Sequence, residues 1–177
     1  VARQVSRWSK QYRASETDNI EAMNNLIEWL PKNIPDDDET TIVHGDYRLD
    51  NMILRNNEVI GILDWELSTL GHPIADFSYH CLSWRTQEAF WDEAKLKELG
   101  IPSEKEYMEM YCKYSGKDLS KNWEFYMAFN MFKIAGILQG ILGRVRDGTA
   151  ASKHAEERGM MVYPLSKAAW DIIENNF

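Results

Sequence analysis

One short segment with a strand pattern interrupts a chain whose apolar residues otherwise recur at helical spacing. Residues 40–44 predict a first strand, and residues 51–54 and 59–63 predict two more on either side of the turn Asn56-Asn57. Since a two-residue turn favours antiparallel pairing of its flanking strands, residues 51–63 predict a small β-hairpin. The chain as a whole is therefore expected to adopt an α+β, mainly α fold.

Helical patterns occupy both sides of this segment. Residues 1–34 predict two helices, the second capped by Thr17 or Asp18 and ended by proline. Residues 72–177 predict a helical bundle. With a length of 177 residues, we expect a single domain that spans residues 1–177.

Three details of the predicted bundle follow from individual residues. Ser103 followed by Glu106 predicts a capping box at the start of a helix, and Pro164 is expected to interrupt the last helix. Residues 125–145 form the most apolar stretch, but it contains lysine, arginine and asparagine, so we interpret it as a buried core helix.

The charge balance restricts the partners. Twenty basic residues against 28 acidic ones give a net charge of −8, and no basic run opposes it. A negatively charged protein repels a phosphate backbone or an anionic membrane surface, so neither a nucleic-acid polymer nor a membrane is expected as a partner.

The two cysteines, Cys81 and Cys112, are too few for a disulfide framework, which favours a reducing compartment such as the cytoplasm.

Polar residues with a specific spacing surround the predicted hairpin. The segment before it reads His44-Gly45-Asp46-Tyr47-Arg48-Leu49-Asp50-Asn51, in the form H-x-D-x-x-x-x-N, and the segment after it reads Ile62-Leu63-Asp64-Trp65-Glu66. Phosphoryl transfer from a nucleotide needs a carboxylate that orients the attacking hydroxyl and oxygen ligands that hold Mg²⁺. Asp46 can supply the first, and Asn51 with Asp64 can supply the second, because a hairpin would hold these two side by side.

These motifs resemble the C-terminal lobe of the aminoglycoside phosphotransferase and choline kinase family, a branch of the protein-kinase-like fold. The resemblance includes Gly71-His72-Pro73-Ile74-Ala75-Asp76-Phe77, similar to the family's G-D-P-x-x-D-[LF] segment, with His72 where the family often has Asp. We do not expect His72 to take part in the reaction. The sequences of the His44–Asn51 segment and of Trp65-Glu66-Leu67-Ser68 are most similar to the kinase-like domain attached to acyl-CoA dehydrogenase family members ten and eleven, and to stand-alone bacterial relatives.

The resemblance implies an ATP-dependent phosphotransferase acting on a small-molecule hydroxyl. It implies Asp46 as the catalytic base and Asn51 and Asp64 as Mg²⁺ ligands, with ATP as the phosphoryl donor. It also implies that His44 and Asp76 support the loop that presents Asp46.

Further roles implied by the resemblance concern the surroundings of these residues. Glu66 could reach the metal directly or through water. The expected acceptor pocket contains four side chains, which are Tyr79, His80, Trp84 and Trp91. The acceptor could be an aminoglycoside, a choline-like cation or a hydroxyacyl thioester, and the nucleotide could be ATP or GTP.

Two other functions compete with this interpretation. One is a pseudokinase or interaction lobe, which intact Asp46, Asn51 and Asp64 disfavour. The other is a metal-dependent hydrolase that uses His44, Asp46, Asp64 and His72, but it leaves Asn51 unexplained.

Two features of kinase-like transfer do not occur in this sequence, namely a glycine-rich loop and a strand lysine paired with a helix glutamate. We therefore expect the N-terminal lobe to be absent and the chain, which begins at Val1, to be the C-terminal lobe of a longer protein, inactive by itself. The uncovered hairpin, with the helices around Trp8 and Tyr12, is expected to mediate a homodimer. A eukaryotic dehydrogenase-linked origin would instead favour mitochondria or peroxisomes.

Overall fold

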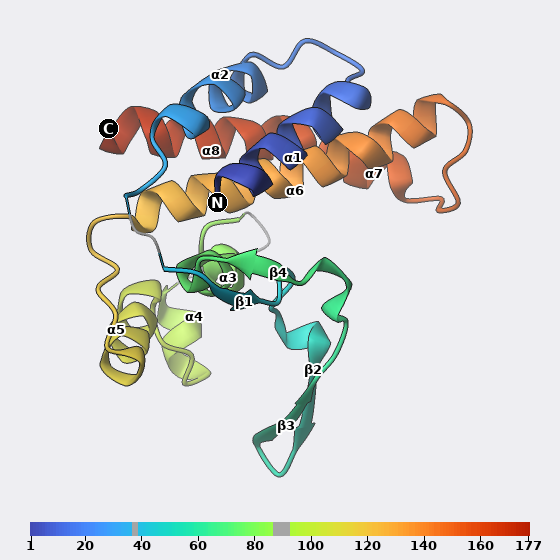
Figure 1. Cartoon of the computed structure of the whole chain (residues 1–177). Helices are drawn as coiled ribbons and strands as arrows, with labels where there is room; N and C mark the ends of the chain where they lie inside the picture. Colours follow the sequence, from blue (N-terminus) through green and yellow to red (C-terminus); the bar gives the residue numbers. More distant parts are fainter. Residues whose placement is uncertain (37–38, 87–92) are drawn as a thin grey trace. The chain divides into compact units, whose positions relative to one another are not determined.

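The computed structural model describes residues 1–36, 39–86 and 93–177 (Figure 1). The chain forms two compact units, each described by itself. A helical unit contains residues 1–37 and 124–177, and a mixed unit contains residues 38–123. The mainly helical composition with small antiparallel sheets confirms the predicted α+β class.

The helical unit is built from amphipathic helices that share one core. Its elements are α1 (Ala2–Ala14), α2 (Glu21–Trp29), the 3₁₀ turn η1 (Leu30–Lys32), α6 (Trp123–Arg146), α7 (Ala155–Met160) and α8 (Val162–Asn176). Helix α2 packs on α8, and α1 packs on η1. Helix α1 buries Val5, Trp8 and Tyr12 on one stripe, as their spacing predicts. The helices around Trp8 and Tyr12 were also expected to contribute to a dimer surface, but these two side chains cannot do so, because only 5% and 0% of their surfaces are accessible.

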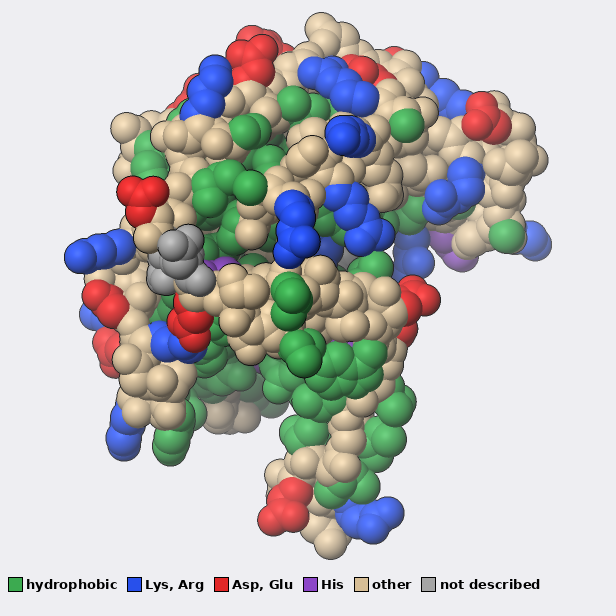
Figure 2. All heavy atoms as spheres, viewed as in Figure 1, with side chains coloured by type: hydrophobic (Ala, Val, Ile, Leu, Met, Phe, Trp, Pro, Cys, Tyr) green, Lys and Arg blue, Asp and Glu red, His purple; other side chains and the backbone are tan. Residues whose placement is uncertain are grey.

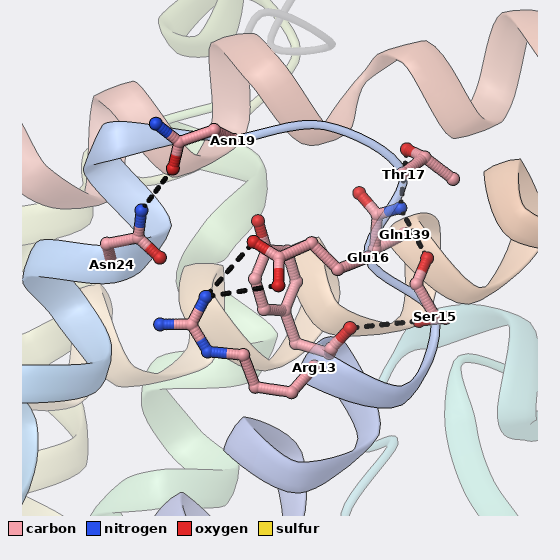
Figure 3. Close-up of polar contacts among 8 residues, drawn as sticks. Arg13, Ser15, Glu16, Thr17, Asn19, Asn24 and Gln139 are labelled. Atoms are coloured by element: carbon pink, nitrogen blue, oxygen red, sulfur yellow. Dashed lines mark hydrogen bonds and ion pairs between the residues drawn. The ribbon is translucent and has the colours of Figure 1, made fainter.

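The predicted cap of α2 is also wrong. Helix α2 begins after Ile20 without a side-chain cap. Thr17 instead accepts a hydrogen bond from Nε2 of the fully buried Gln139, at 2.8 Å (Figure 3). Asp18 accepts bonds from Arg146 and Tyr163. The side-chain oxygens of Thr17 and Asp18, which the sequence assigned to the cap of the helix, thus accept hydrogen bonds from residues that are distant in the sequence.

The last helix is interrupted, but not at the predicted residue. The break lies at Met161, between α7 and α8, and Pro164 lies in the first turn of α8. Proline is tolerated there because a backbone N–H in the first turn has no acceptor within the helix.

Helix α6 contains the apolar stretch. Among the described residues, it is the one helix long and apolar enough to cross a membrane by length and composition. In the structure, 72% of its most apolar window is buried, in agreement with the core helix predicted from the sequence.

Two small antiparallel sheets lie in the mixed unit. Strand β2 (Met52–Arg55) pairs with β3 (Glu58–Ile62) through a turn in which Asn56 and Asn57 adopt φ of 50° and 63°, which confirms the predicted hairpin. Strand β1 (Thr41–Val43) pairs with β4 (Thr69–Gly71). The sequence did not predict β4, because three residues are too few to show an alternating pattern.

Helices and 3₁₀ turns complete the mixed unit. They are η2 (Leu49–Asn51), η3 (Trp65–Leu67), α3 (Pro73–His80), η4 (Cys81–Trp84), α4 (Glu93–Glu98) and α5 (Glu104–Ser115). The capping box of Ser103 and Glu106 at the start of α5 is confirmed. Helix α3 lies against the β1–β4 pair, and the β2–β3 hairpin projects away from that pair (Figure 1).

Candidate active site

His44 follows β1 and connects the two motif segments. It is 3% exposed, and its Nδ1 accepts a hydrogen bond from the backbone N–H of Asp46 at 3.2 Å. In the neutral imidazole the proton is then on Nε2, which donates to the carbonyl oxygen of Leu63 at 2.7 Å. His44 therefore links the loop that carries Asp46 to the residue before Asp64.

The carboxylate of Asp76 holds the start of the same loop. Its two oxygens accept hydrogen bonds from the backbone N–H groups of His44 and Gly45, the latter at 2.8 Å. Asp76 lies in the first turn of α3, which is capped by Nδ1 of His72 through the backbone N–H of Ile74. His72 thus has a structural function at the position where the sequence departs from the family pattern.

Gly45 lies close to the segment after Asp64. Its φ is +84°, and a Cβ atom there would lie 2.5 Å from the carbonyl oxygen of Leu67. Only glycine fits this close approach without displacement. Sequence reasoning gave Gly45 no function, although its place directly before Asp46 was a signal.

Both carboxylate oxygens of Asp46 have partners. Nδ2 of Asn51 donates to Oδ2 and also to the backbone carbonyl of Asp46, each at 2.9 Å. The hydroxyl of Tyr79 donates to Oδ1 at 2.5 Å. The structure therefore brings the predicted base, a predicted metal ligand and a predicted pocket residue together.

The hairpin also places Asn51 next to the segment of Asp64. The backbone N–H of Leu63 donates to the carbonyl of Asn51 at 2.8 Å, which continues the β2–β3 ladder by one pair beyond Met52 and Ile62. Asp64 follows with φ 61° and ψ 59°, a left-handed conformation that aspartate tolerates better than most residues. Its side chain is exposed.

The oxygen atoms at this end of the hairpin suit a hard cation. Because both bonds of the Asn51 amide use Nδ2, its Oδ1 remains for a metal, and Asp64 adds an anionic oxygen. Mg²⁺ is usually held by one or two protein oxygens, with substrate phosphates and water completing the shell. The residues therefore fit a nucleotide-bound Mg²⁺.

A dedicated metal cage is not part of this site. In the described parts of the chain, no group of three or more His, Cys, Asp or Glu side chains is placed to hold a metal ion. Both ring nitrogens of His44 are bonded to the backbone, and His72 caps α3. These contacts give the hydrolase interpretation no support.

Glu66 and Arg48 lie at the border of the site. Glu66 is exposed within η3. Its neighbour Trp65 packs on His44, with ring centroids 4.7 Å apart. Arg48 forms an ion pair with Asp50 that is largely exposed and so contributes little stability.

Aromatic rings extend from the loop along α3 to α5. Tyr47 packs on His80 at 5.5 Å between centroids, His80 packs on Tyr107 at 5.6 Å, and Trp84 stacks on Tyr107 at 5.3 Å. Burial lowers the pKa of His80, which favours its neutral form. The structure thus brings His80 and Trp84 onto one ring, whereas Tyr79 contacts Asp46. Trp91 lies outside the described residues.

Two open hollows lie on the helical unit and contain none of the predicted site residues. One, of about 580 Å³, is lined by α1 side chains, and the other, of about 670 Å³, is lined by residues of α1, α6 and the segments that follow them. The loop and hairpin of the mixed unit, rather than these hollows, carry the chemistry described above.

Comparisons with known proteins identify the family of this chain. Residues 1–111 match the profile of the phosphotransferase enzyme family. The chain is 46% identical to acyl-CoA dehydrogenase family member 10 of Mus musculus, over 97% of this chain and 17% of that protein. It is 40% identical to acyl-CoA dehydrogenase family member 11 of Homo sapiens, over 99% of this chain and 23% of that protein. The chain thus spans about a fifth of the length of these curated relatives.

A solved structure provides a comparison of the fold. A crystal structure described as a candidate aminoglycoside phosphotransferase, from Ralstonia eutropha JMP134, superposes with a TM-score of 0.89 at 48% sequence identity. The match covers 98% of this chain and 55% of that one. Because the family profile matches more than half of the residues of this chain, the chain belongs to the phosphotransferase enzyme family.

Proposed function

We propose that this chain is part of an enzyme that transfers the γ-phosphoryl group of ATP, in the presence of Mg²⁺, to a hydroxyl group of a small molecule. The observation that carries the proposal is the contact between Asp46 and Asn51, at the end of the hairpin that leads to Asp64. Membership of the phosphotransferase family supports it.

Asp46 is the base in this proposal. A carboxylate within hydrogen-bond reach of the acceptor hydroxyl orients it and accepts its proton. Asn51 holds the side chain and the backbone carbonyl of Asp46 at 2.9 Å, and His44 and Asp76 fix the backbone of the loop. The carboxylate is thus positioned by contacts that exist before the acceptor arrives.

Asn51 and Asp64 would hold Mg²⁺, with Glu66 as a further oxygen at its border. The bound ion would neutralise charge on the phosphates. Asn51 would have two functions in this arrangement, since its nitrogen positions the base and its oxygen would bind the metal. The exposed, left-handed Asp64 presents its carboxylate to solvent, where a nucleotide can reach it.

The rest of the nucleotide site would come from an N-terminal lobe. Kinase-like transfer uses a glycine-rich loop and a lysine that this sequence lacks. The solved relative is longer than this chain, which covers 55% of it, and this supports the assignment of the chain as a C-terminal lobe. We propose that the lobe has no transfer activity by itself.

The relatives suggest which acceptors to try first. Because two of them are named acyl-CoA dehydrogenases, hydroxyacyl thioesters are the leading class. Aminoglycosides are the second class, in view of the solved relative, and choline-like alcohols are the third. The rings of His80 and Trp84, joined by Tyr107, would form one wall of the acceptor pocket.

The test is a panel of these hydroxyl compounds, incubated with the full-length protein and MgATP or MgGTP while nucleotide consumption is followed. We expect one class to be phosphorylated, and the Asp46→Asn variant to lose that activity. A full-length protein that consumes no nucleotide with any compound, but binds MgATP, would favour the pseudokinase. Metal-dependent turnover without nucleotide would favour the hydrolase.

A further inference from the structure

Helix α3 contacts the catalytic loop twice, at positions one turn apart. Asp76 holds the backbone N–H groups of His44 and Gly45, and Tyr79 donates its hydroxyl to the side chain of Asp46. Residues three apart on a helix lie on the same face, so one face of α3 fixes both the backbone of the loop and the carboxylate that it presents.

The phenol of Tyr79 is held as a hydrogen-bond donor. Burial raises its pKa well above the ordinary value, and the bond to the Asp46 carboxylate raises it further, which outweighs the opposite effect of the nearby Arg48. Tyr79 therefore remains protonated around neutral pH. Because an ionised carboxylate accepts but does not donate, the direction of the bond is fixed from Tyr79 to Oδ1 of Asp46.

Two donors define the orientation of the Asp46 carboxylate. Asn51 donates to Oδ2 at 2.9 Å, and Tyr79 donates to Oδ1 at 2.5 Å. With one donor alone, the carboxylate could rotate about the Cβ–Cγ bond, whereas two donors on different oxygens hold its plane. Each carboxylate oxygen can accept a second bond, so an acceptor hydroxyl can still approach.

We propose that Tyr79 is a positioning residue, which holds the carboxylate of Asp46 in the plane needed to accept the proton of the acceptor hydroxyl. This inference rests on the proposed function of Asp46. It differs from the expected place of Tyr79 in the acceptor pocket, because Tyr79 here acts through Asp46 rather than through contact with the acceptor.

The first test is Tyr79→Phe in the full-length protein, assayed with MgATP and the compound phosphorylated in the panel above. Losing a bond to a charged group is expected to lower kcat about tenfold, without changing the KM for MgATP. The matched control is Tyr163→Phe in the helical unit, which removes a Tyr-to-Asp bond of the same 2.5 Å length, to Asp18. The control should retain the kcat of the parent.

A double-mutant cycle separates positioning from a general structural effect. In an Asp46→Ala background, Tyr79 has no carboxylate to orient, so Tyr79→Phe should cause no further loss of the residual rate. The same fractional loss in both backgrounds would overturn the proposal, and so would an unchanged kcat for Tyr79→Phe alone.

A crystal structure of the Tyr79→Phe variant makes the inference independent of the assay. We expect the Asp46 carboxylate to be rotated or to occupy two orientations. A carboxylate that keeps its orientation would overturn the inference. If the full-length protein phosphorylates no compound, the proposed function fails, while the crystal structure still decides whether Tyr79 orients Asp46.

Discussion

The imidazole Nε2 of His44 donates a hydrogen bond to the carbonyl oxygen of Leu63, at 2.7 Å. This single bond connects the residue that begins the candidate catalytic loop, which presents Asp46, with the residue that precedes Asp64. Because His44 is buried and its other nitrogen accepts from Asp46, the ring has one orientation and one tautomer. One side chain therefore connects the backbone of the candidate base with the residue before the candidate metal ligand.

Replacing the candidate base should remove catalysis but not nucleotide binding. In the full-length protein, we expect Asp46→Asn to lower turnover by roughly 10²- to 10⁴-fold, the usual contribution of a positioned base. Equilibrium binding of MgATP should be unchanged, because Asp46 is not among the proposed metal ligands. Unchanged turnover would exclude Asp46 from the mechanism.

The two candidate metal ligands should differ in importance. Asp64→Ala is expected to abolish Mg²⁺-dependent nucleotide binding more completely than Asn51→Ala, since an anionic oxygen binds a hard cation more strongly than a neutral amide. Titration calorimetry on the full-length variants measures this order. Asp171→Ala, which removes only an ion pair with Lys167 on α8, is the control. Equal metal affinity for the two site variants would contradict the assigned roles.

Gly45 should not tolerate a side chain. Gly45→Ala combines a positive φ with a Cβ atom 2.5 Å from the carbonyl oxygen of Leu67. Gly116→Ala is the matched control, because its φ is +71° but no atom beyond its two chain neighbours lies within 4 Å of its added Cβ. We expect the control to lower the free energy of unfolding by about 1 kcal/mol and Gly45→Ala by about 1–3 kcal/mol more. Urea denaturation measures both, and equal losses would show that the close contact is relieved without cost.

Asp76 should contribute more to stability than an exposed aspartate with a similar bond. Asp76→Ala leaves the N–H groups of His44 and Gly45 without their acceptor, and we expect a loss of about 2–4 kcal/mol in the free energy of unfolding. The control Asp118→Ala removes only exposed bonds from Ser120 and should lose about 1 kcal/mol or less. If thermal denaturation gave the two variants the same stability, Asp76 would not be the main support of the loop.

The β2–β3 hairpin should make the 177-residue chain self-associate. Figure 2 shows hydrophobic side chains gathered over the hairpin, and Leu54 and Ile60 are 58% and 48% exposed. Exposed strands with apolar side chains favour pairing with another chain. Light scattering should detect a dimer that Leu54→Glu weakens, whereas Leu99→Glu, at a residue 49% exposed outside the hairpin, should not. A monomeric parent chain would refute this expectation.

The sequence by itself determined the features that depend on near neighbours. Helical spacing identified the buried stripe of α1, and the Ser103–Glu106 pair identified the start of α5. The turn Asn56-Asn57 determined the hairpin and hence the closeness of Asn51 to the segment of Asp64. Each of these signals acts over a few residues, or across a single tight turn, so composition and spacing were sufficient.

Only the tertiary structure decided which distant residues complete the site. Tyr79 lies 33 residues from Asp46, and no motif predicted the bond between them. The family resemblance implied that Asp76 supports the loop, but the spacing of Asp76, 32 residues from His44, did not show that contact. The pairing of β4 with β1 and the use of Thr17 by Gln139 are also contacts between distant segments. Such contacts depend on where the packed helices and strands bring backbone donors and side-chain oxygens together. Spacing along the chain carries no record of that placement, because buried polar groups take whichever partner the folded chain offers.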